Sequence, residues 1–209
     1  MDGSLIADIV YSLVLYSALA LLALPAVFFM LWAFLGFFKK HRRFFYFLTF
    51  MLFAGVIAGF YYMRNDWLLW YYAFPSYIQV SGLLLFIASF LLMRIVDHHL
   101  GFKVRIFWSV LKGESYQLAT GGLFKIVRHP IYALVPVMII GALLYTGEWV
   151  LLYPLFFNLM TRRWYARREE AYVKQFATGD YETYVKQTQN RFYPKLIWAF
   201  CGWLKKGRW

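Results

Sequence analysis

Charged residues and cysteine are both scarce in this sequence of 209 residues. Asp, Glu, Lys and Arg make up 15% of the chain, whereas soluble globular proteins contain about 25%. The single cysteine, Cys201, can form no disulfide within the chain and cannot be part of a metal-binding cysteine pair. With only six prolines, the composition is not that of a collagen-like or a disordered chain. These scarcities exclude a disulfide scaffold, a fibre and a disordered protein.

Apolar residues take the place of the missing charge. The chain is 62% hydrophobic and 23% aromatic, well above the apolar share of about 45–50% in soluble proteins. A water-soluble domain of this size could not bury so much apolar surface, so we expect an integral membrane protein. The net charge of +12 lies in short clusters between long apolar runs. Such clusters are typical of charge that orients a protein in a bilayer, and we expect no nucleic-acid partner.

Five apolar stretches are candidates for membrane-spanning helices, each of which needs about 20 residues. The first three are residues 9–38, 44–63 and 77–96, and Pro25 predicts a kink in the first. The fourth and fifth, residues 131–145 and 149–160, are short and flank Gly147, which favours a tight helical hairpin. Beyond them we expect a helix over 165–176, a break at 178–180 and a short helix to about Gln189. The tail, 196–209, has the spacing of an amphipathic helix on the membrane surface.

Basic clusters predict the orientation, because positively charged loops stay in the cytoplasm. The cluster at 39–43, the segment 97–130 and the arginines at 162–168 share one side if the N-terminus is outside and the C-terminus is cytoplasmic. The sequence thus predicts an all-α, multi-pass protein with about five transmembrane helices and a cytoplasmic C-terminal region, by default in a bacterial inner membrane. We divide it into three spans with their connection (1–117), a hairpin with cytoplasmic helices (118–194) and the tail (195–209).

Chemically versatile residues gather in two blocks of the second half. The first block is residues 120–132, which enters the fourth span and contains Arg128 and His129. The second block is residues 167–170, Arg-Arg-Glu-Glu, which leaves the fifth span, with residues 180–184 beyond it. If the fourth and fifth spans form a hairpin, their cytoplasmic ends are adjacent. Both blocks would then line one pocket at the membrane surface.

Each block also has a purely structural interpretation. Arg128 and His129 can anchor a helix whose first residue is Pro130, a favoured position for proline. Glu170 and Lys174 have the i, i+4 spacing of a surface ion pair. The residues taken singly therefore leave both interpretations open.

The order of the motifs resembles one known family. Residues 122–132 read GLFKIVRHPIY and resemble the G-x-[YF]-[RK]-x-x-R-H-P-x-Y motif of the isoprenylcysteine carboxyl methyltransferases. In that family a hydrophobic hairpin, an EE pair and paired tyrosines near a proline follow the motif. This chain has Glu169-Glu170, Tyr181, Tyr184 and Pro194 in that order. The resemblance covers about residues 118–194.

The resemblance implies an enzyme that transfers a methyl group from S-adenosylmethionine to a lipophilic or lipidated acceptor reached from the surrounding membrane lipids. It implies a donor site made of Gly122, Arg128, His129, Pro130, Tyr132, Glu169, Glu170, Tyr181 and Tyr184. Arg163, Arg167 and Glu170 are its candidate catalytic residues, and no metal is expected. The G-x-G-x-x-G fingerprint of a soluble dinucleotide fold is absent, so the donor needs a different site. The oligomeric state is left open.

One departure from the family pattern and one further resemblance keep the acceptor and the chemistry open. Tyr165 stands where carboxyl-methylating members of the family carry an arginine, so the acceptor can be an isoprenylcysteine-like carboxylate, a lipid amine or a thiol. Residues 121–124, GGLF, also resemble membrane steroid 5α-reductases, so an NADPH-dependent steroid or isoprenoid reductase is the second hypothesis. A non-catalytic membrane scaffold or transporter subunit is the third, and it predicts no cofactor binding.

Overall fold

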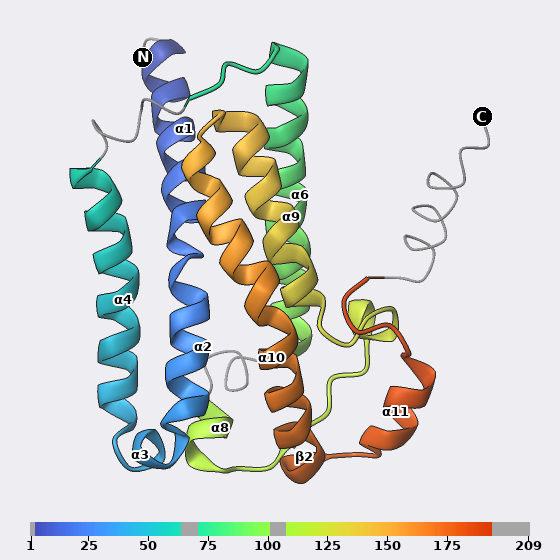
Figure 1. The fold of residues 1–209 in the computed structure, drawn as a ribbon. Helices are drawn as coiled ribbons and strands as arrows, with labels where there is room; N and C mark the ends of the chain where they lie inside the picture. The colour runs from blue at the N-terminus through green and yellow to red at the C-terminus, as the bar shows by residue number, and fades with distance from the viewer. Residues whose placement is uncertain (1–2, 64–70, 101–107, 194–209) are drawn as a thin grey trace.

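The computed structural model describes residues 3–63, 71–100 and 108–193 (Figure 1). Within these residues, the long helices lie side by side with their axes along the height of the bundle. They are α1 (Gly3–Ala20), α2 (Ala23–Ala33), α4 (Arg42–Tyr62), α6 (Ser76–Leu100), α9 (Pro130–Thr146) and α10 (Leu152–Phe176). The predicted all-α class is confirmed. The predicted amphipathic tail at 196–209 lies outside the described residues.

Short elements lie between the long helices and after the last of them, and α3, α8 and α11 are at the lower end of Figure 1. These are α3 (Leu35–Lys40), α8 (Trp108–Lys112), the 3₁₀ helix η2 (Gly122–Lys125) and α11 (Tyr181–Gln187), while a second 3₁₀ helix, η3 (Trp149–Leu151), precedes α10. Two residues of β1 (Tyr116–Gln117) pair in parallel with β2 (Ala177–Thr178). The predicted break before the last helix is present, with Gly179 at φ 121° and Asp180 accepting a hydrogen bond from the Thr183 amide.

Three helical stretches are long and apolar enough to cross a membrane: Leu5–Ala33, Arg42–Tyr62 and Ser76–Leu100. They correspond to the first three predicted spans. The fourth, Pro130–Thr146, is apolar but has 17 residues. The fifth is the first half of α10, whose second half is polar. The structure therefore supports the first three spans, and the fourth and fifth remain a prediction.

Pro25 interrupts the first span, but the break lies before it, at residues 21–22 between α1 and α2. Proline has no amide hydrogen, so the Leu21 carbonyl, four residues earlier, loses its usual helical partner. Asn158 of α10 takes that place: its Nδ2 donates to the Leu21 carbonyl over 3.1 Å. The Tyr165 hydroxyl, also on α10, donates to the Pro25 carbonyl over 2.7 Å. The kink thus joins the first span to the helix that carries Glu169 and Glu170.

Replacing Asn158 with alanine tests this connection. We expect Asn158→Ala to lower the free energy of unfolding by about 1 kcal/mol, the usual size of a hydrogen bond between membrane helices. Thermal unfolding in detergent measures the change. Thr161→Ala is the matched control, because the Thr161 hydroxyl bonds the Phe157 carbonyl within its own helix. Equal losses in the two variants would contradict a role for the bond between helices.

Close contact with α6 fixes the position of α9. A Cβ atom on Gly82 of α6 would lie 2.6 Å from the Tyr145 amide nitrogen, and one on Gly141 of α9 would lie 2.6 Å from that of Phe86. Helices approach this closely only where both carry small residues. At the far end of α9, Gly147 ends the helix in a left-handed conformation (φ 74°). The predicted turn at Gly147 is therefore present, and it returns the chain along α10.

Candidate functional site

His129 lies at the centre of a charged cluster where α9 begins. Its Nε2 atom is 3.0 Å from Glu170 Oε1, and its Nδ1 atom is 3.4 Å from Glu169 Oε2. The imidazole is buried, with 8% of the residue exposed. His129 precedes the first residue of α9 while both glutamates lie in the polar half of α10. The hairpin therefore brings the two sequence blocks into direct contact.

Glu170 binds a second cation, Arg191, in a two-point interaction. Arg191 Nε donates to Glu170 Oε1 over 3.1 Å, and its Nη2 donates to Oε2 over 2.6 Å. Such paired bonds between guanidinium and carboxylate are strong and directional. Arg128 Nε is 3.5 Å from Glu170 Oε1 but makes no hydrogen bond, although this atom is buried. Glu170 thus holds three basic side chains near one carboxylate.

Sequence reasoning missed Arg191. It lies outside both blocks, and no helical spacing relates it to Glu170. One signal was available: a carboxylate buried beside a histidine needs a permanent cation, and Arg191 is close to Pro194, where the motif ends.

The segment containing Arg191 runs against the first block through backbone hydrogen bonds. The Arg128 amide donates to the Asn190 carbonyl over 3.0 Å, and the His129 amide donates to the Arg191 carbonyl over 2.9 Å. A bond of 2.7 Å from Arg162 Nη1 to the Tyr193 hydroxyl holds the same segment to α10. Residues 190–193 therefore pack against the start of α9 and against α10 beside the site.

The cluster changes the proton affinity of its members. Burial alone would lower the pKa of His129, but the hydrogen bonds and negative charges of Glu169 and Glu170 outweigh it and raise that pKa above 6.5. Burial would raise the pKa of Glu170, but His129 and Arg191 lower it below 4.5. The site therefore favours an imidazolium between carboxylates. Burial also raises the pKa of Tyr184 to about 12, which keeps its phenol protonated at neutral pH.

Two cavities lie on either side of this cluster. The larger, about 340 Å³, lies among α2, α4, α6, α9 and α10. Arg128, His129 and Glu169 form its polar end, and Asp97, Asn158 and Arg162 are further polar residues of its lining. Its volume is in the range of ligand pockets, about 300–1,000 Å³. The smaller, about 50 Å³, lies towards α11 and shares Arg128, His129 and Glu169 with the first.

Most of the predicted site residues line these cavities. Arg128, His129, Pro130, Tyr132 and Glu169 line the larger one, and Glu170, Tyr181 and Tyr184 line the smaller one. The Tyr132 ring stacks on His129 with 5.4 Å between centroids. Their assignment to a donor site stays a prediction.

Three predicted residues lie elsewhere. Gly122 lines neither cavity and packs against the His99 ring. Arg163 and Arg167 are exposed on α10 and line neither cavity, whereas Arg162 lines the larger one. Helix phase explains this difference, because positions 162, 165 and 169 lie on the face of α10 towards the cavity. The catalytic role suggested for Arg163 and Arg167 thus has no geometric support here.

The structural interpretation of Glu170 as part of a surface ion pair is wrong. Lys174 Nζ lies 2.8 Å from Glu182 Oε1 on α11, while both Glu170 oxygens face Arg191. Glu170 is therefore part of the buried cluster.

Comparison with known families supports the functional interpretation of this region. Residues 77–177 match the family model described as phospholipid methyltransferase. The match runs from the start of α6 to just beyond α10 and contains both the R-H-P sequence and Glu169-Glu170. This family includes membrane methyltransferases similar to the isoprenylcysteine carboxyl methyltransferases, so the resemblance is confirmed at that level. Neither a curated protein nor a solved structure matches the chain.

Proposed function

We propose that this protein transfers a methyl group from S-adenosylmethionine to a lipophilic acceptor in the membrane, because residues 77–177 match the phospholipid methyltransferase family model. The family itself indicates a membrane methyltransferase with lipid-like substrates. The observation that carries the proposal is the contact of His129 with both Glu169 and Glu170 between two cavities. A methyltransferase family favours this function over an NADPH-dependent reductase or a non-catalytic scaffold.

The residues around the smaller cavity fit the chemistry of the donor. S-adenosylmethionine supplies an electrophilic methyl group on a positively charged sulfur, and it also carries hydroxyl, ammonium and carboxylate groups. Glu169, whose side chain is 38% exposed, can accept from the hydroxyl or ammonium groups. The buried Arg128 Nε has no hydrogen-bond partner and can donate to the carboxylate. The ring of Tyr181 can stabilise a cation by about 0.5–2 kcal/mol.

His129 positions these groups in our proposal. Both of its ring nitrogens face carboxylates. Neither nitrogen is therefore available to bind the adenine group of S-adenosylmethionine. The Ile126 carbonyl, four residues before Pro130, accepts from Asn190 Nδ2 over 3.4 Å and is also engaged. Because the smaller cavity is below the usual size of a ligand pocket, we infer that the donor extends past Glu169 into the polar end of the larger one.

The larger cavity suits the apolar part of the acceptor. Leu24, Phe28, Met93, Ile131 and Val135 are among its lining residues. An acceptor held there would present its nucleophile at the polar end, near Glu169. A carboxylate or thiolate needs no base, and an amine would be kept neutral by removal from water. Catalysis would then rest on orientation, which can contribute about 7–11 kcal/mol.

Ligand-induced stabilisation tests the proposal. We expect S-adenosylhomocysteine at 100 times its Kd to stabilise the detergent-purified protein by about 2.7 kcal/mol, and NADPH to leave its melting temperature unchanged. Calorimetry should show at least tenfold weaker donor binding in Glu169→Ala. Glu182→Ala removes a carboxylate outside both cavities and should bind the donor normally. Stabilisation by NADPH alone, or by neither compound, would overturn the proposal.

A further inference from the structure

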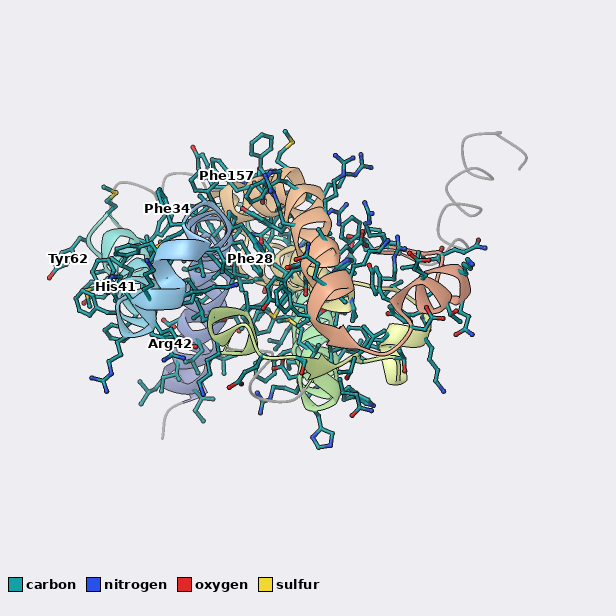
Figure 2. All side chains as sticks on the ribbon, turned by 90° about the horizontal axis from the view of Figure 1, so that it is seen from below. Phe28, Phe34, His41, Arg42, Tyr62 and Phe157 are labelled. Carbon is teal, nitrogen blue, oxygen red and sulfur yellow. The ribbon has the colours of Figure 1, made fainter. Side chains whose placement is uncertain are left out.

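A third cavity, with a very different lining, lies at the connection between α3 and α4. It has a volume of about 630 Å³ and is lined by six consecutive or nearly consecutive residues: Lys40, His41, Arg42, Arg43, Phe44 and Tyr46. Figure 2 shows His41 and Arg42 on the side of the molecule away from α11. The methyl-transfer site proposed above contains none of these residues. This basic cavity therefore needs an explanation of its own.

The basic cavity is rich in positively charged side chains. Lys39, Lys40, Arg42 and Arg43 surround His41, and the sequence contains no Asp or Glu between Asp8 and Asp66. Within the described part of the chain, no carboxylate forms an ion pair with Lys40 or Arg43. Both of these side chains are exposed. The cavity is therefore suited to an anionic group from outside the chain.

Exposed aromatic rings adjoin the basic cavity on its apolar side. Phe37 and Phe44 are both about half exposed, with 6.0 Å between their ring centroids, and Phe37 also lies 4.6 Å from the His41 ring. Phe34 on the preceding turn and Phe47 on α4 are exposed as well. A soluble anion would gain nothing from these rings. A lipid could place its headgroup in the cavity and its chains along the phenylalanines.

We propose that the basic cavity binds the phosphate headgroup of an anionic phospholipid. Lys40 and Arg43 supply the charge, and the rings of Phe37 and Phe44 contact the upper part of the acyl chains. Basic pockets between membrane helices are known to bind anionic lipid headgroups. Because the residues differ from those of the methyl-transfer site, the inference stands without the proposed activity.

Binding of a labelled phosphatidylglycerol to the full chain in detergent micelles tests the proposal. We expect Lys40→Gln/Arg43→Gln to weaken this binding about tenfold or more, since each basic residue near a lipid surface contributes substantially. Binding of labelled phosphatidylcholine should not change. The matched control is Lys125→Gln/Lys186→Gln, which removes two exposed lysines from η2 and α11 and should change binding less than twofold. Unchanged melting temperatures in both pairs would show that folding is intact.

Two results would overturn the proposal. Equal weakening by the two pairs of substitutions would show that overall charge, and not this cavity, attracts the lipid. Displacement of phosphatidylglycerol by millimolar inorganic phosphate, together with unaltered binding in Phe37→Ala/Phe44→Ala, would show a site for a free anion.

Discussion

Glu170→Gln should lower the free energy of unfolding by about 2–3 kcal/mol. The substitution keeps the shape of the side chain but removes the negative charge shared by Arg191, His129 and Arg128. Breaking a buried ion pair by removing one partner costs about 3–5 kcal/mol, and we take a smaller value because the Glu170 side chain is 16% exposed. Thermal unfolding in detergent measures the loss.

The loss should depend on pH in a defined way. The pKa of Glu170 is lowered on folding, so its contribution is present above its ordinary value of 4.5 and disappears as the pH falls through the folded pKa. The pKa of His129 is raised, so its contribution is present below 6.5 and disappears as the pH rises through the folded pKa. The difference in melting temperature between wild type and Glu170→Gln should therefore be largest between these values. It should shrink only in part above pH 6.5, because Arg191 stays charged.

Glu182→Gln is the control for this experiment. Glu182 also forms an ion pair, with Lys174, but its side chain is 67% exposed, and surface pairs contribute little. A loss of stability equal to that of Glu170→Gln, or a loss without pH dependence, would contradict the buried cluster.

Gly141→Ala should cost about 2–3 kcal/mol and also weaken donor binding. Its new methyl group would lie 2.6 Å from the Phe86 amide nitrogen and 2.9 Å from the Gly82 carbonyl oxygen. Backbone atoms cannot rotate away, so α6 and α9 must separate, and overpacking of this kind costs about 1–3 kcal/mol. Because Pro130 begins the same helix, the shift would also displace His129. Melting temperature and calorimetry with S-adenosylhomocysteine measure the two effects.

Gly55→Ala and Gly59→Ala in α4 are the matched controls. A Cβ atom at either position would meet nothing within 4 Å, and alanine favours a helix over glycine by about 1 kcal/mol. We expect these variants to be as stable as the wild type or slightly more so. Destabilisation equal to that of Gly141→Ala would show that glycine is needed for some reason other than close helix contact.

Local sequence patterns predicted the helices and the contact between the two blocks. The contact could be predicted because it follows from two neighbouring helices and the short turn between them. Apolar runs marked α4 and α6 to within a few residues, and Gly147 marked the turn that places His129 beside Glu169. The break before α2 was displaced from Pro25 because a proline cannot donate to the carbonyl four residues earlier, here that of Leu21.

The parts that local patterns missed depend on contacts distant in sequence. Arg191 reaches Glu170 only because residues 190–193 return to the start of α9. Arg162, and not Arg163 or Arg167, lines the larger cavity because packing of α10 sets which face turns inward. The four arginines in the sequence 162–168 do not by themselves show which face of α10 turns towards the cavity.

The return of residues 190–193 to the start of α9 has a consequence for biosynthesis. A ribosome that has made every membrane helix has still not released the Asn190 and Arg191 carbonyls that bind the Arg128 and His129 amides. Until those residues emerge, Glu170 lacks the paired hydrogen bonds of Arg191. The charged cluster is therefore completed only after the helices that carry His129 and Glu170 have been synthesised.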